Sequence, residues 1–199
     1  MGSKERIQRQ KEDTRKNILG AALHIVKQEG WNALSMRKIA DVIEYTAPII
    51  YEYFSNKEGI LIELTRQGYI KLGAKIKAAK EKETGTAAKL EAMWIAYWNF
   101  AFEEKELYQL MFGVDMNCCE LNKILPEAEY TTKLFNDEIE KLITKDTHQE
   151  NVVCLKYYTF WSIIHGLISI NLVQKGTNEE INQQILIGAI KAIIATIND

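Results

Sequence analysis

Residues that interrupt helices and form tight turns are scarce in this chain, which has only two prolines and 11 glycines among its 199 residues. A β-sandwich or β-barrel needs turn residues about every ten residues, so this composition supplies too few for either architecture. Apolar residues make up 47% of the chain and charged residues 26%, a balance typical of globular proteins and unlike that of disordered ones. Together these features predict an all-α fold.

Helical periodicity in the first 82 residues predicts four helices. Apolar residues at steps of three and four predict a helix over about residues 13–28, and Gly30 follows it at a position that favours positive φ. Ser35 is expected to begin a second helix, and Thr46 to cap a short third one. A fourth helix is predicted from residue 57 to about residue 82, because nothing in the sequence interrupts that stretch. The second and third helices, joined by a tight turn, form a helix-turn-helix pattern.

Residues in the first quarter of the chain also match a known pattern in fixed order and spacing. They are Thr14-Arg15, Ile18-Leu19, Ala21-Ala22, Gly30, Ser35, Ile39-Ala40, Tyr51-Glu52-Tyr53-Phe54 and Lys57-Glu58. This stretch resembles the DNA-binding domain of the TetR family of bacterial repressors. Further on, Trp161 and His165-Gly166 resemble the Trp-x-x-x-His-Gly signature of the family's WHG-type C-terminal subgroup. The resemblance implies a helix-turn-helix domain over residues 1–56 and a helical effector-binding and dimerisation domain over residues 57–199.

Two glutamates depart from the family's pattern. The turn between the second and third helices usually contains a glycine, where this chain has Glu44. If that position needs positive φ, the substitution costs about 1 kcal/mol of strain. Glu52 lies on the recognition helix, where its carboxylate either repels phosphate or accepts a hydrogen bond from a cytosine amino group.

Nine residues are expected to meet DNA: Ser35, Met36, Arg37, Thr46, Ala47, Pro48, Tyr51, Tyr53 and Lys57. Small residues at the start of the third helix allow close approach to base edges, and Tyr51 can reach a phosphate or a base. Arg37 has the fork geometry that recognises guanine, and Lys57 would meet the backbone as a point charge. Tyr51 and Tyr53 could instead be core aromatics, and Arg37 an ordinary solvated charge.

The first sixteen residues hold a local excess of positive charge. Lys4, Arg6, Arg9, Lys11, Arg15 and Lys16 oppose Glu5, Glu12 and Asp13. A basic N-terminal arm on a chain of net charge −2 is a weak indication of nucleic-acid binding. A solvated, disordered tail explains the same composition.

The middle of the chain is rich in aromatic residues. Seven residues are candidates for an apolar pocket that binds a small apolar or aromatic effector, as the family's regulatory domain usually contains: Trp94, Trp98, Phe102, Met111, Phe112, Trp161 and His165. An aromatic stripe at helical spacing is more often core packing than a ligand site. His165 also fits a buried histidine satisfied by a carbonyl, and Met116 would suit an adaptable pocket.

The end of the chain supplies the expected dimer interface. Helices over residues 151–174 and 179–197 are too apolar to have one fully solvated face, and in the TetR family the last two helices pair with their twofold mates. Residues 157–174 contain no Asp, Glu, Lys or Arg, but their Ser, His and Asn side chains are costly in lipid. We therefore expect a helix buried in protein, with no membrane partner.

Catalytic and metal-binding patterns find little support in the sequence. His24, His148 and His165 are far apart, and no phosphate loop or nucleophile elbow is present. Cys118 and Cys119 have no evident basic neighbour to activate a thiol, and three cysteines favour a reducing cytoplasm. The chain is therefore expected to be no enzyme and to need no cofactor.

The function predicted is that of a cytoplasmic DNA-binding repressor, which occupies a palindromic operator as a homodimer until a small apolar effector releases it. The alternative is a helical binding module that sequesters an apolar ligand without binding DNA.

Overall fold

The computed structural model describes residues 2–113, 125–144, 149–174 and 178–198. Within these ranges the regular structure is helical and contains no strand, so the predicted all-α fold is confirmed. The chain divides into two compact units, one of Met1–Gly68 with Glu106–Leu121 and one of Tyr69–Lys105 with Asn122–Asp199. Unit 1 and unit 2 are described separately below. The predicted domain boundary after residue 56 stays a prediction.

Unit 1 is built on α1 (Ser3–Glu29), a 27-residue helix. Its buried residues include the apolar stripe seen in the sequence, with Ile18 and Ala22 at 0% exposure. The helix ends at Gly30, whose φ of 81° confirms the expected conformation. It begins ten residues before the predicted start, because its first turns are polar and carry no apolar periodicity to mark them.

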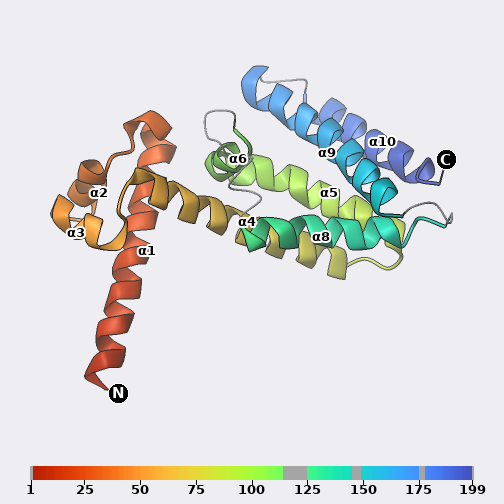
Figure 1. Ribbon diagram of the computed structural model, residues 1–199. Helices are drawn as coiled ribbons and strands as arrows, with labels where there is room; N and C mark the ends of the chain where they lie inside the picture. Colours follow the sequence, from red (N-terminus) through yellow and green to blue (C-terminus); the bar gives the residue numbers. More distant parts are fainter. Residues whose placement is uncertain (1, 114–124, 145–148, 175–177, 199) are drawn as a thin grey trace. The chain divides into compact units, whose positions relative to one another are not determined.

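The helix-turn-helix comprises α2 (Met36–Val42) and α3 (Ala47–Tyr53), which pack against each other (Figure 1). The Ser35 hydroxyl caps α2 by accepting a hydrogen bond from the Lys38 N–H at 3.2 Å. Thr46 occupies the capping position of α3 with Pro48 in the first turn, but its side chain makes no capping hydrogen bond. In the turn between the helices Glu44 adopts a φ of 58°, the left-handed conformation that was expected to strain a glutamate.

Two further elements complete unit 1 alongside the short helix η1 (Trp31–Ala33): the first part of α4 (Lys57–Glu81) and α6 (Lys105–Phe112). The Asn56 side chain accepts a hydrogen bond from the Gly59 N–H at 2.9 Å and so caps α4. Gly68 permits α4 and α6 to approach closely, since a Cβ there would lie 2.5 Å from the Met111 sulfur.

Unit 2 packs α8 (Pro126–Glu140), α9 (Gln149–Gln174) and α10 (Glu179–Ala195) against α5 (Thr86–Glu103), with the remainder of α4 alongside (Figure 1). The core of unit 2 is aromatic. The Trp94 ring of α5 stacks on Phe135 of α8 at 4.0 Å between centroids and on Phe160 of α9 at 5.4 Å. All three side chains are at most 1% exposed, so they fill the space between the three helices.

The expectation that the uncharged part of α9 is buried in protein is correct for only one side of the helix. Phe160, Ile164 and Ile168 form a buried stripe at 0% exposure. On the opposite side Ile170 and Val173 are 53% and 82% exposed. Residues Val152–Val173 are long and apolar enough to span a membrane by composition alone, and 22% of that stretch is buried within the described residues. A helix that is apolar all round leaves one face uncovered when only one side meets the core.

Candidate nucleic-acid interface and effector site

The helix α3 separates a buried face from a solvent face. Ile50 and Phe54 are 0% and 5% exposed and anchor the helix to unit 1, whereas Tyr51 is 54% exposed. Thr46 and Pro48 are also exposed, and Ala47 and Tyr53 are half-buried. Of the two tyrosines that could have been core residues, Tyr51 therefore projects into solvent and Tyr53 lies partly covered.

Around α2, the predicted DNA-binding residues differ in what they present. Ser35 and Arg37 are exposed, whereas Met36 is 7% exposed and packs into unit 1. Because Met36 is the first residue of α2, its backbone N–H has no partner within the helix, and this group is what Met36 could offer to an anion. The Lys57 ammonium donates a hydrogen bond to the Trp31 carbonyl at 3.2 Å, which holds the side chain against η1.

Arg15 of α1 contacts both the recognition helix α3 and the helix α4. Its guanidinium lies 5.1 Å from the centre of the Phe54 ring, at the end of α3, and pairs with the Glu63 carboxylate of α4 at 3.0 Å. The contacts connect α1, α3 and α4 at one point. The position of α3 within unit 1 is therefore fixed by a cation–π contact and an ion pair as well as by apolar burial.

In unit 2 the predicted effector residues do not form one group. Trp94 is enclosed by the core rings, Trp98 is half-buried and Phe102 is 40% exposed, with the last two rings 4.8 Å apart. Successive steps of four residues rotate by about 40° around a helix, so a stripe of this spacing moves from the core to the surface. Met111 and Phe112 belong to unit 1, where Met111 packs against Gly68.

Trp98 and Phe102 line a hollow of about 350 Å³ with residues of α9 and α10. One wall is an amide pair: the Asn182 side chain donates to the Asn171 carbonyl oxygen at 2.7 Å, and Asn171 donates back at 3.1 Å. Asn182 is 6% exposed, so this reciprocal pair satisfies a buried amide. The hollow thus combines aromatic rings with polar groups.

Trp161 and His165 lie together, as their i, i+4 spacing predicts. Their rings stack at 4.7 Å with an interplanar angle of 12°, and the Trp161 indole N–H donates to the Tyr97 hydroxyl at 3.1 Å. Burial lowers the pKa of His165, which favours the neutral imidazole at pH 7. The predicted residues Met116, Cys118, Cys119 and His148 lie outside the described residues.

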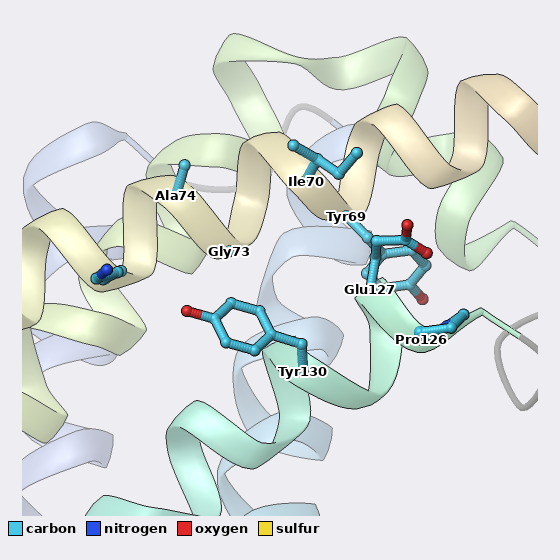
Figure 2. A pocket seen from close by; sticks show the side chains of 8 residues that line it. Tyr69, Ile70, Gly73, Ala74, Pro126, Glu127 and Tyr130 are labelled. Atoms are coloured by element: carbon cyan, nitrogen blue, oxygen red, sulfur yellow. The ribbon is translucent and has the colours of Figure 1, made fainter.

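A second hollow, of about 400 Å³, lies between α4 and α8 and was not anticipated from the sequence (Figure 2). It is lined by Tyr69, Ile70, Gly73, Ala74 and Lys77 of α4 and by Pro126, Glu127 and Tyr130 of α8. In Figure 2 the Tyr130 ring stands between the two helices. A Cβ at Gly73 would lie 3.3 Å from the Thr131 hydroxyl, so the glycine lets the helices approach. A glycine inside a helix is the sequence signal that marks such a contact.

The helices α9 and α10, which pack against each other, leave large apolar side chains exposed, and we call this set the α9–α10 apolar face. It consists of Leu155, Tyr158, Ile163, Ile170, Val173, Ile181 and Ile185. Two glycines of these helices, Gly166 and Gly188, have open space around the position of a Cβ. An exposed apolar surface of this kind marks an interaction site.

Two family profiles match the chain. The profile described as bacterial regulatory proteins, tetR family, matches residues 18–64, and the profile described as tetracyclin repressor-like, C-terminal domain, matches residues 90–183. The first range contains the whole of α2 and α3, and the second contains the whole of α8 and α9. The profiles therefore cover the helix-turn-helix in unit 1 and most of the aromatic core in unit 2.

The chain is similar in sequence to the HTH-type transcriptional activator FasR of Mycolicibacterium smegmatis, with 23% identity over 70% of this chain and 63% of FasR. It is also similar to YobS, an uncharacterized HTH-type transcriptional regulator of Bacillus subtilis, with 26% identity over 66% of this chain and 62% of YobS. The matched part is thus a little under two thirds of the length of either relative. A solved TetR family transcription regulator from Marinobacter aquaeolei VT8 has the same fold, with a TM-score of 0.65, 18% identity and coverage of 92% of this chain and 97% of that one.

Proposed function

Because the chain belongs to the TetR family of bacterial transcriptional regulators and has its WHG-type C-terminal domain, we propose that it is a repressor that occupies a palindromic operator and is released by a small apolar effector. The protein is a DNA-binding transcription regulator with a helix-turn-helix, and its family is not an enzyme class. The observation that carries the proposal is the solvent face of α3, where Thr46, Pro48 and Tyr51 are exposed beside the buried Ile50 and Phe54.

A symmetric dimer follows from the geometry of operator reading. One short recognition helix contacts few base pairs, and two half-sites one helical turn apart (about 34–36 Å) need two helices related by a twofold axis. The α9–α10 apolar face supports dimerisation, because it offers exposed apolar side chains on two neighbouring helices. Such a regulator acts in the cytoplasm, where its DNA is.

The effector binds in the hollow between α4 and α8, in our proposal, instead of under the tryptophans. Trp94 is enclosed by the aromatic rings of the core, whereas the α4–α8 hollow is open and has a mainly apolar lining. The helix α4 begins at Lys57, directly after the recognition helix, and its later part lines the hollow. A ligand that prefers one conformation of α4 would shift the population of DNA-competent dimers. The hollow beside Trp98 and Phe102 is the second candidate.

DNA binding is tested by a gel mobility shift with a duplex from the region upstream of the protein's own gene. The shift is measured at two salt concentrations. A shifted complex that weakens steeply with salt supports the regulator, because phosphate contacts release counterions. Absence of a shift at low salt contradicts it and favours the alternative, a module that sequesters an apolar ligand.

The effector site is tested with the fluorescent dye ANS, an apolar anion, as the probe. Replacing Ala74 with Phe fills the α4–α8 hollow and is expected to abolish most dye enhancement while DNA binding persists. Ala78→Phe is the matched control, one turn further along α4 and also exposed but outside the lining. If Ala74→Phe and Ala78→Phe bind the dye equally and Trp98→Ala loses dye binding, the effector site is the hollow beside Trp98 and Phe102.

A further inference from the structure

The first turns of α1 lie outside the part of the helix that packs into unit 1. Every residue from Gly2 to Asp13 is exposed, and the first buried residue of the helix is Thr14. Figure 1 shows these first turns of α1 at the N-terminal end of the long helix. We call residues 3–13 the N-terminal arm. At 1.5 Å per residue it extends about 16 Å beyond the packed part of α1. Short helices without tertiary packing are marginal in water, so a binding partner would stabilise this one.

The basic residues of the arm are not spread evenly around the helix. Lys4, Gln8, Lys11 and Arg15 recur at steps of four, three and four and therefore share one side of α1. Asp13 falls on another side of the helix, whereas Glu12 lies one turn after Gln8 and its carboxylate accepts a hydrogen bond from the Gln8 amide at 2.9 Å. We refer to the side formed by these four donor residues as the basic stripe. Its cations are Lys4, Lys11 and Arg15, and the Glu12 carboxylate lies at its edge, bound to the Gln8 amide.

The basic stripe ends beside α3, the helix that we propose recognises DNA. Its last residue, Arg15, lies over the Phe54 ring at the end of α3 and pairs with Glu63. From there the stripe continues outward through Lys11 and Lys4, both exposed. The same side of α1 is apolar and buried after Thr14, so the change from apolar to basic occurs where the core ends.

We infer that the N-terminal arm binds the phosphate backbone of DNA flanking the site read by α3, through Lys4 and Lys11. This inference rests on the proposed DNA-binding function and adds a second, sequence-independent contact to it. Two exposed ammonium groups on one side of the helix are complementary to a strand of phosphates. The arm thus supplies affinity and orientation, and α3 supplies sequence preference.

The test measures binding to a mixed-sequence duplex by fluorescence anisotropy across a salt series. In Lys4→Gln/Lys11→Gln the slope of log K against log salt should be shallower by about 2 per protomer, because each lost phosphate contact removes about 0.9. Affinity at about 0.1 M salt should fall on the order of tenfold or more. Glutamine keeps helix propensity, so the arm is expected to remain helical.

The matched control is Arg6→Gln/Arg9→Gln, which removes two charges from the same arm but outside the basic stripe. We expect it to change the slope by less than half as much. Equal slopes for both double variants would overturn the inference, since only overall charge would then matter. So would an unchanged slope on deletion of residues 2–11, which tests the arm without relying on any one side chain.

Two further outcomes of the binding experiment distinguish failure of this inference from failure of the proposed function. If the wild-type protein binds the upstream duplex and the Lys4→Gln/Lys11→Gln variant binds it equally well, the inference fails and the function stands. If the wild-type protein binds no duplex, both fail. Vesicles of phosphatidylglycerol serve as the competing polyanion, and tighter stripe-dependent binding to them than to DNA would reassign the arm to a membrane surface.

Discussion

Recognition of the operator's base sequence is expected to depend most on Tyr51, because this is the exposed aromatic side chain of α3. The change Tyr51→Phe removes only the hydroxyl, and one lost hydrogen bond of about 1 kcal/mol corresponds to about a fivefold fall in operator affinity. Competition gel shifts with the upstream duplex measure it. Tyr130→Phe, at a residue of similar exposure in α8, is the control and, with no effector present, should leave affinity unchanged. Equal loss in both would remove Tyr51 from the interface.

Glu44 is the residue where local strain can be relieved. Its φ of 58° suits glycine, so Glu44→Gly is expected to raise the free energy of unfolding by about 1 kcal/mol. Urea denaturation followed by circular dichroism measures the change. Asp41→Gly makes a similar substitution at an exposed helical position of α2 and should lower stability by about 1 kcal/mol. The idea fails if the two variants shift the midpoint in the same direction.

Single residues differ in how well the sequence predicts their surroundings. Gly30 after α1 has the positive φ that was expected, because turn chemistry is local. For Glu44 the sequence left open whether the turn keeps a positive φ, and the structure shows that it does. Met36 was expected at the DNA but is buried, since its neighbours in the fold decide which side of a seven-residue helix packs. The nine DNA contacts and the effector contacts themselves remain predictions.

At the scale of elements, Glu138 links α8 to α4. Its carboxylate is 1% exposed and accepts from Lys141 at 2.6 Å and from Lys80 of α4 at 2.8 Å. Burial alone raises the pKa of Glu138, but the two ammonium groups outweigh it and hold the pKa below its ordinary value of 4.5. This pair therefore holds together two helices that line the proposed effector hollow.

The Glu138→Gln change is expected to lower the free energy of unfolding at pH 7 by about 1.5–3 kcal/mol, the range for hydrogen bonds to a charged group. A carboxyl with a lowered folded pKa contributes stability above its unfolded pKa and loses it as pH falls through the folded value. The gap between wild type and variant should thus narrow below about pH 4.5. Urea titrations from pH 3 to 7, with the exposed Glu140→Gln as control, measure it. A gap independent of pH would contradict the assigned charge state.

The sequence predicted most helices well but did not predict the hollow between α4 and α8. Periodicity indicated the helices of the first 82 residues, because each carries an apolar stripe or a cap at its start. The arm of α1 was missed, since polar residues carry no such signal. The α4–α8 hollow was missed as well, because it depends on how closely two helices approach at Gly73, 53 residues before α8 begins at Pro126.

At the scale of the whole molecule, the proposed function requires a dimer, because a palindromic operator has two half-sites. Residues 157–173 carry no charged side chain, so burying this α9 part of the α9–α10 apolar face against a second copy removes apolar surface from water without desolvating an ion of that segment. The same face explains why α9 has the composition of a membrane span while only 22% of that stretch is buried within the described part of one protomer.

A charge placed on this face should separate the protomers. Val173→Asp alters the most exposed apolar side chain of the face, and combined with Ile170→Asp it is expected to convert a dimer to a monomer in light scattering after size exclusion. Both side chains project away from the core, so each monomer should keep its helical circular dichroism. Operator affinity should fall by at least a hundredfold, because a monomer binds only one half-site. Tyr130→Asp places a charge on an apolar side chain of α8 that is 48% exposed, and it should leave the mass unchanged. A dimer that survives the double change would place the twofold axis on another surface, and α3 would then be paired by different helices.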